Sequence, residues 1–276
     1  MHFLVEEQNF DSYKKILLIF DVDGTLRPDT VEALDHRYPK VDPIVAKKLM
    51  ELNALSQIEI SILTARSYVD IYRSNLPKNV TKYCGFGKQI IQNEILRYPK
   101  EEFHRAYDET TMFIDIIKDI LGPKLTSSLD FLITPGDFSV YFEAKDFQEQ
   151  KAKIMEIIEI VLFNSQRWKI DDLGREVVFK DAKYPYTKGD AIYHILDLVD
   201  LSEPTKVFFF GDSFADYKAM EALRSYQKMH PQKRLKVKNI AVGPILKDKE
   251  LVDIVFESYK ETLEFVNDLH AKLFSR

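Results

Sequence analysis

The chain has 276 residues, of which 45% are hydrophobic and 30% charged, which is the composition of a folded globular protein and excludes a disordered one. A net charge of −5 gives no electrostatic reason to expect nucleic acid or an anionic membrane as a partner. The single cysteine, Cys84, excludes an internal disulfide and a multi-cysteine zinc site, and it fits a reducing cytoplasm. We find neither a signal-peptide pattern nor an apolar run long enough to cross a membrane, so we expect a cytoplasmic protein. These properties predict no particular oligomeric state.

The first predicted element is a strand over residues 16–20, which runs directly into Asp21, Asp23, Gly24 and Thr25. Five consecutive apolar residues closed by a turn signal are typical of a strand buried on both faces of a parallel sheet. Ligands bind beyond the carboxyl ends of such strands. Two carboxylates this close repel each other unless a cation lies between them, and Mg²⁺ is the simplest cation for oxygen ligands. An ordinary Asp-Gly turn is the alternative interpretation.

An irregular loop is expected to follow as far as residue 39, and a helix begins at Asp42-Pro43, with an Asp cap and a Pro in the first turn. Residues 58–63 form the next predicted strand, which ends at Thr64-Ala65-Arg66. A hydroxyl at such a strand end can bind a phosphate oxygen together with the exposed N–H groups of the following helix. Considered alone, Thr64 would be an ordinary helix cap.

A third strand is expected to end in the glycine-rich turn Gly85-Phe86-Gly87-Lys88, where Lys88 would face either a site or solvent. Between residues 94 and 185 the pattern changes to helix, two strands, helix, two strands. The helical stretches are 112–121 and 152–162, and the strand-like stretches are 131–134, 139–142, 168–170 and 177–179. This order predicts an α+β unit with helices on one face of an antiparallel sheet. Glu143 and Lys145, at a strand end there, are candidates for substrate contact, although a solvated strand end is the simpler interpretation.

The chain then returns to a helix that begins near residue 188, with Thr187 and Asp190 as a capping-box pair. A lysine at a helix N-terminus, here Lys188, is unfavourable to the helix dipole, which favours a functional role for it. Residues 206–210 predict another buried strand, which leads into Asp212 and then a helix carrying Asp216. A strand over 239–242 and a helix over 260–274 complete the chain.

Taken in order, these motifs resemble the four motifs of the haloacid dehalogenase (HAD) superfamily of phosphohydrolases. The resemblance implies an α/β fold, with a Rossmann-like parallel sheet that carries helices on both faces and an inserted α+β cap domain. The catalytic core would comprise residues 1–93 and 186–276, and a cap of type 2 would comprise residues 94–185 and close over the core site.

The resemblance also assigns roles to the motif residues. Asp21 would be the nucleophile that becomes an aspartyl phosphate, and Asp23 the general acid and base. The phosphate-binding residues would be Thr64, Lys188, Gly24 and Thr25, and the residues that hold Mg²⁺ would be Asp21, Asp23 through its backbone carbonyl, Asp212 and Asp216. Asp216 would either complete the metal coordination through water or fix Lys188. Arg66 and Lys88 join Glu143 and Lys145 as candidate substrate contacts.

The cap order is similar to that of sugar-phosphate phosphatases, including trehalose-6-phosphate phosphatases. The resemblance is incomplete, because Ala65 replaces the usual glycine and the Phe86-Gly87 segment lacks the usual His-Gly signature. We therefore expect hydrolysis of a small phosphorylated metabolite, most simply a sugar phosphate, with trehalose-6-phosphate one candidate. A sugar phosphomutase of the same superfamily and a non-catalytic binding protein on this scaffold are the alternatives.

Overall fold

The computed structural model describes residues 12–28, 40–127, 129–142, 147–162, 167–172, 176–247 and 249–275. The chain divides into two compact units, a core unit of Met1–Arg97 with Tyr186–Arg276 and an inserted unit of Tyr98–Pro185. Most of the loop expected up to residue 39 lies outside the described residues, as do Glu143 and Lys145. Among the helices of the described residues, none has both the length and the apolar character needed to cross a membrane.

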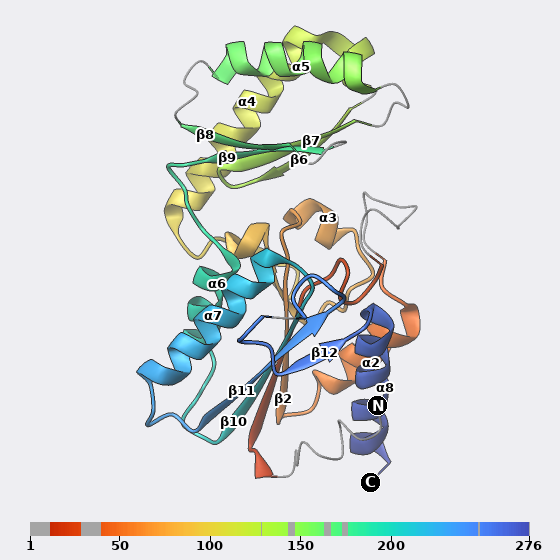
Figure 1. Ribbon diagram of the computed structural model, residues 1–276, viewed down its shortest axis with the longest axis vertical. Helices are drawn as coiled ribbons and strands as arrows, with labels where there is room; N and C mark the ends of the chain where they lie inside the picture. The colour runs from red at the N-terminus through yellow and green to blue at the C-terminus, as the bar shows by residue number, and fades with distance from the viewer. Residues whose placement is uncertain are drawn as a thin grey trace. The chain divides into compact units, whose positions relative to one another are not determined.

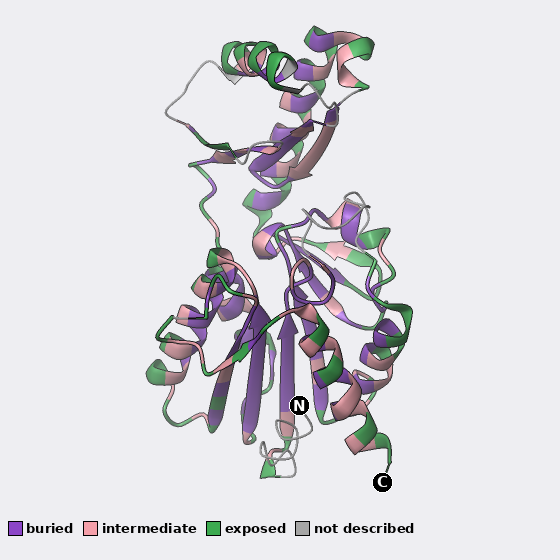
Figure 2. Cartoon of the chain, turned by 45° about the vertical axis from the view of Figure 1, so that its right-hand side comes forward, coloured by how far each residue is buried: buried purple, intermediate pink, exposed green. Residues whose placement is uncertain are grey.

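The core unit is built on a sheet that contains eight strands among the described residues, in the order β12-β11-β10-β1-β2-β3-β4-β5. The strands are β1 (Lys15–Phe20), β2 (Ile58–Leu63), β3 (Thr81–Cys84), β4 (Gln89–Gln92), β5 (Ile95–Arg97), β10 (Thr205–Gly211), β11 (Leu235–Val242) and β12 (Ile254–Phe256). The strands from β12 to β3 run parallel, whereas β4 and β5 pair antiparallel at one edge. Strand β1 lies between β10 and β2 and is buried over nearly its whole length. Figure 2 shows the central strands of the core sheet as buried.

Helices cover both faces of this sheet (Figure 1). One face carries α2 (Pro43–Leu52), α3 (Tyr68–Tyr72) and α8 (Tyr259–Phe274), and the other carries α6 (Lys188–Leu198) and α7 (Phe214–Met229). Alternate side chains of β1 serve the two faces, because Leu18 packs into the first hydrophobic cluster and Leu17 and Ile19 into the second. The Rossmann-like α/β core implied by the family resemblance is confirmed.

Two helix starts follow the predicted capping chemistry. The side chain of Asp42 accepts a hydrogen bond of 2.7 Å from the backbone N–H of Ile44, and Pro43 is the first helical residue of α2. At the start of α6, Thr187 and Asp190 form a capping box, with a bond of 2.8 Å from the Thr187 N–H to the Asp190 carboxylate. This second cap fixes the backbone immediately before Lys188.

The inserted unit contains an antiparallel sheet in the order β6-β7-β9-β8, with α4 (Glu101–Thr126) and α5 (Phe147–Leu162) packed on it. Its strands are β6 (Leu129–Thr134), β7 (Asp137–Phe142), β8 (Trp168–Asp172) and β9 (Glu176–Asp181). The predicted order of helix, two strands, helix, two strands is confirmed. Trp168 belongs to the core of this unit, where its ring lies edge-on to Phe113 and Phe138.

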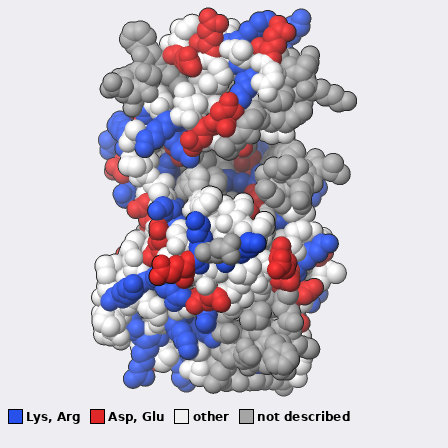
Figure 3. All heavy atoms as spheres, in the orientation of Figure 1, with Lys and Arg blue, Asp and Glu red and all other residues white. Residues whose placement is uncertain are grey.

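Four strands of the core sheet differ from the sequence expectation, because β4 and β12 were not predicted and β5 and β11 were predicted differently. Residues 95–97, which we assigned to the inserted α+β unit, form β5 and pair with β4 in the core sheet. Strand β11 begins at Leu235, four residues before the predicted start at Asn239, because Leu235 and Val237 are buried and alternate with Lys236 and Lys238. Lys236 and Lys238 therefore occupy outward positions of β11. Figure 3 shows acidic and basic side chains side by side on the described surface that faces the viewer.

The turn after β3 is packed directly against α6. Gly85, Phe86 and Gly87 have φ values of 55°, 61° and 96°, so all three backbones are left-handed. A Cβ on Gly87 would lie only 2.4 Å from the Cβ of Ala191 in α6. Glycine at this position therefore allows both the backbone conformation and the close approach to the helix.

We expect Gly87→Ala to destabilise the protein by about 2–4 kcal/mol, because left-handed strain and overpacking add at this residue. Gly243→Ala is the matched control, since Gly243 has a φ of 76° but no described heavy atom within 4 Å of the position that a Cβ would take. The control should lose only about 1–2 kcal/mol in urea unfolding. Equal losses for the two variants would contradict the role given to the contact with Ala191.

Candidate active site

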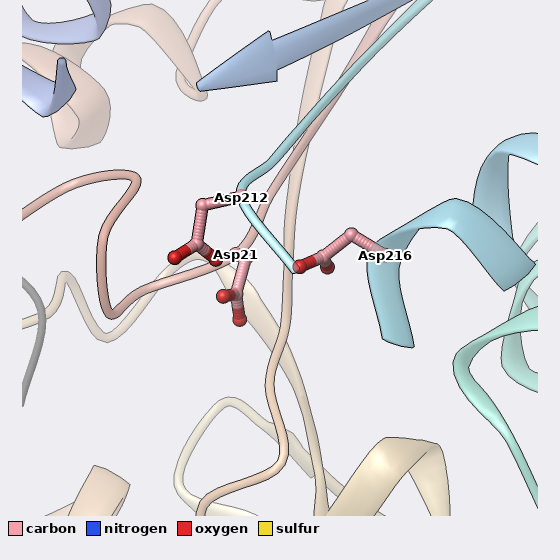
Figure 4. A group of neighbouring side chains, drawn as sticks. All are labelled: Asp21, Asp212 and Asp216. Atoms are coloured by element: carbon pink, nitrogen blue, oxygen red, sulfur yellow. The ribbon is translucent and has the colours of Figure 1, made fainter. Parts of the chain in front are cut away.

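Three aspartates meet at the carboxyl ends of β1 and β10. The two strands are parallel neighbours with Phe20 opposite Phe210, so Asp21 and Asp212 leave the sheet at the same edge. The backbone N–H of Asp21 donates to the carbonyl of Phe210 at 3.0 Å. Asp216 comes from the first turn of α7, and Figure 4 shows the three carboxyl groups converging. One ligand oxygen of each acid lies within 4.8 Å of the others, as a metal-binding group requires.

Lys188 binds two of these acids from the first residue of α6. Its Nζ lies 2.8 Å from Oδ1 of Asp21 and 2.6 Å from Oδ1 of Asp216, and its side chain is only 2% exposed. The unfavourable position of an ammonium at a helix N-terminus is thus offset by two carboxylates. When all four groups are ionised, the cluster carries two net negative charges, which a single Mg²⁺ would balance.

Burial raises the pKa of Asp21 to about 7, an effect that Lys188 opposes and the nearby carboxylate of Asp216 reinforces. Burial also acts to lower the pKa of Lys188, but the charges of Asp21 and Asp216 outweigh it, so that pKa is raised. Lys188 therefore remains an ammonium group, whereas Asp21 exchanges a proton near neutral pH in the absence of a metal.

Two glycines allow the acids to approach each other. Gly24 has a φ of 70°, and a Cβ there would lie 2.0 Å from Oδ2 of Asp212. A Cβ on Gly211 would lie 2.3 Å from the Cβ of Asp216. The Gly that follows Asp23 and the Gly that precedes Asp212 are therefore needed for space around the acids as well as for turning the chain.

The carboxylate of Asp216 is occupied on both oxygens by the protein. Oδ1 binds Lys188, while Oδ2 accepts from the backbone N–H of Ser213 at 3.0 Å and from its hydroxyl at 2.6 Å. Of the two roles expected for Asp216, these contacts support fixing Lys188. Asp21 and Asp212 are the carboxylates better placed to hold a metal.

Asp23 lies in a different environment, although it follows Asp21 by only two residues. Among the described residues, the acid group contains Asp21, Asp212 and Asp216 without Asp23. The carboxylate of Asp23 instead receives two hydrogen bonds from Arg66, at 2.5 Å from Nε and 3.0 Å from Nη2. Arg27 approaches the same carboxylate, with its Nε 3.6 Å from Oδ1. Our sequence interpretation did not single out Arg27, for which the only available signal was its position four residues after Asp23.

The remaining predicted residues lie around the end of β2. Thr64 is buried, and its Oγ1 accepts from the backbone N–H of Arg66 at 3.2 Å. Lys88 is 1% exposed, so the alternative in which it faces solvent is wrong. Thr25 is also buried, and its hydroxyl has no hydrogen-bond partner among the described residues. The structure thus brings Asp21, Lys188, Asp212 and Asp216 into one cluster and places Arg66 on Asp23, while a contact of Arg66 or Lys88 with substrate stays a prediction.

The sequence matches no protein-family model and no curated protein. Solved structures match nearly the whole chain. The C-terminal domain of Candida albicans trehalose-6-phosphate phosphatase has 17% identity and a TM-score of 0.69, over 98% of this chain and 97% of that one. A trehalose-6-phosphate phosphatase related protein has 16% identity and a TM-score of 0.60, over 94% and 99%. The C-terminal domain of the Candida albicans trehalose synthase regulatory protein has 12% identity and a TM-score of 0.60, over 95% and 97%. The chain therefore shares its overall fold with these three structures.

We expect Lys188→Met to lower the free energy of unfolding by about 3–5 kcal/mol near pH 8 in the presence of a chelator, because it leaves two buried carboxylates without their cation. Burial raises the pKa of Asp21, and without Lys188 its ionised form loses the ammonium that opposes this effect. The loss of stability should therefore shrink as the pH falls and Asp21 becomes protonated. Urea unfolding at about pH 8 and pH 5 measures the difference.

The matched control is Lys218→Met, which removes an exposed lysine paired with Glu221 at 2.8 Å. It should change stability by less than about 0.5 kcal/mol at either pH. A Lys188→Met variant with the same loss at both pH values would show that the Asp21 carboxylate is not left uncompensated when Lys188 is removed.

Proposed function

We propose that this protein is a Mg²⁺-dependent phosphomonoesterase that hydrolyses a small phosphorylated metabolite, with a sugar phosphate as the substrate class. The observation that carries the proposal is the buried cluster of Asp21, Lys188, Asp212 and Asp216 at the carboxyl ends of β1 and β10. This cluster combines a candidate nucleophile, a cation for the phosphoryl oxygens and hard oxygen ligands. The names of similar structures support trehalose-6-phosphate as one candidate substrate. We also propose a cytoplasmic location, with which the buried thiol of Cys84 is compatible.

The donor set suits Mg²⁺, because its carboxylate oxygens are close together and carry an excess of negative charge. Asp21 and Asp212, with the backbone carbonyl of Asp23, are the residues that would hold the ion. When bound, Mg²⁺ reduces the repulsion between the nucleophilic carboxylate and the phosphate dianion.

In the proposed reaction, a carboxylate oxygen of Asp21 attacks phosphorus in line with the leaving group. The bond from phosphorus to the leaving oxygen breaks, and that oxygen keeps the electron pair and takes a proton from Asp23. Water then attacks the phosphorus of the aspartyl phosphate and gives a proton to Asp23. This hydrolysis releases inorganic phosphate and restores the Asp21 carboxylate. The hydroxyl of Thr64, the ammonium of Lys188 and the backbone N–H groups of Gly24 and Thr25 would bind the phosphoryl oxygens.

The first test is release of inorganic phosphate, with Mg²⁺, from a panel of sugar, nucleotide and cofactor phosphates. We expect Asp21→Asn to lower kcat on the best substrate by about 10³-fold or more, because the nucleophile is lost. Asp115→Asn, on the exposed surface of α4, is the matched control and should leave kcat unchanged. Isomerised sugar without free phosphate would indicate a mutase, and wild-type activity in Asp21→Asn would exclude Asp21 as the nucleophile.

A second test uses the pKa of about 7 for Asp21 in the metal-free protein. Mg²⁺ binds the ionised carboxylate, so binding must displace a proton at pH values below this pKa. We expect the apparent Mg²⁺ affinity to fall roughly 20-fold between about pH 7.5 and pH 5.5, with proton release detected by calorimetry in buffers of different ionisation enthalpy. An Mg²⁺ affinity that does not change over this pH range would show that Asp21 does not bind the ion.

A further inference from the structure

Asp21 and Asp23 follow the same strand two residues apart, yet their side chains have separate partners. Asp21 shares the acid cluster with Asp212 and binds Lys188 at 2.8 Å. Asp23 binds the guanidinium of Arg66 through both of its oxygens, at 2.5 Å and 3.0 Å. A two-point contact of this kind fixes the plane and the direction of a carboxylate, which a single hydrogen bond does not.

Arg66 is itself held in place. Its backbone N–H donates to Oγ1 of Thr64 at 3.2 Å, and its carbonyl accepts from the N–H of Gly85 at 2.7 Å. The residue as a whole is 8% exposed, so its side chain has little room to change rotamer. The guanidinium therefore extends to Asp23 from a backbone that is fixed on both sides.

Without Arg66, the Asp23 carboxylate could turn toward the acid cluster of Asp21, Asp212 and Asp216 and bind a cation there. It is a hard oxygen ligand located beside a cluster that attracts divalent cations, and carboxylates take part readily in such coordination. An Asp23 side chain bound there would no longer be available to the leaving oxygen of a substrate.

We propose that Arg66 is a positioning residue, which keeps the carboxyl group of Asp23 away from the acid cluster and aimed for proton transfer to the leaving group. This inference rests on the proposed phosphomonoesterase activity. In the step concerned, Asp23 carries a proton on one oxygen while Arg66 holds the other. The bond between phosphorus and the leaving oxygen breaks as Asp23 transfers that proton to the leaving oxygen, and the resulting carboxylate makes the two-point contact with Arg66. Arg66 thereby acts through Asp23, without contacting the reacting atoms.

The requirement for this proton depends on the leaving group. An alkoxide or a strongly basic phenolate leaves poorly without protonation, whereas p-nitrophenolate leaves readily as an anion. The test is therefore kcat/KM for a series of aryl phosphates from p-nitrophenyl phosphate to phenyl phosphate. Because kcat/KM includes only steps up to the first irreversible one, later hydrolysis of the aspartyl phosphate does not obscure the comparison.

We expect Arg66→Gln to lower kcat/KM on the order of 10²-fold for phenyl phosphate and no more than about threefold for p-nitrophenyl phosphate. Asp23→Asn should show the same selectivity, and the double variant should lose no more than Asp23→Asn alone, since both changes remove one function. Arg66→Lys keeps the charge but loses the two-point contact, so it should show the same dependence on the leaving group.

Arg105→Gln is the matched control, because Arg105 is exposed on α4, where its guanidinium pairs with Glu101 at 2.9 Å. It should leave both substrates unaffected. Equal losses on all leaving groups, or losses that multiply in the double variant, would overturn the positioning role. If Arg66→Gln does not fold, Arg66→Lys carries the same comparison. A wild-type protein that releases phosphate from no substrate would overturn the proposed function, and this role with it.

Discussion

The buried ion pairs of Lys188 are the interaction on which the arrangement of the site depends. They join three segments that are far apart in the chain, namely the end of β1, the start of α6 and the start of α7. A buried ammonium is tolerated only while its carboxylate partners stay in place, because desolvation of an unpaired charge costs several kcal/mol. Gly189, beside Lys188, helps to set this geometry, since a Cβ there would lie 2.9 Å from the carbonyl oxygen of Lys218 in α7.

Asp21 and Asp23 have chemically identical side chains, but these side chains lie in different surroundings. Asp21 lies among buried carboxylates beside an ammonium, where the excess of negative charge attracts a divalent cation. Its burial raises its pKa to about 7, so a proton competes with that cation. Asp23 lies between two arginines, with its carboxylate held by Arg66. Two neighbouring carboxyl groups in different environments can serve as nucleophile and as proton carrier in one reaction. In the proposed reaction, the roles of Asp21 and Asp23 thus differ because their partners differ and not because their residue types do.

The sequence predicted the central strands and the main helices because each leaves a local pattern, such as an apolar run or a cap. The cluster around Asp21 followed from the family resemblance. The sequence could not predict where Arg66 and Arg27 point, since side-chain direction depends on packing between segments. The β4–β5 edge was missed for a similar reason. Residues 95–97 are short and partly exposed, and only their pairing with β4 assigns them to the core sheet. The burial of Lys88 likewise has no local signal.

The central claim is that the carboxylate of Asp21, held beside Lys188 and Asp212, accepts the phosphoryl group. The most direct measurement is to quench the protein during turnover of a phosphate ester with Mg²⁺, reduce it with borohydride and analyse its peptides by mass spectrometry. Borohydride converts an aspartyl phosphate to homoserine. We predict homoserine at position 21, formed only with both substrate and Mg²⁺ present. Continued turnover with homoserine at a different aspartate, or at none, would contradict the account.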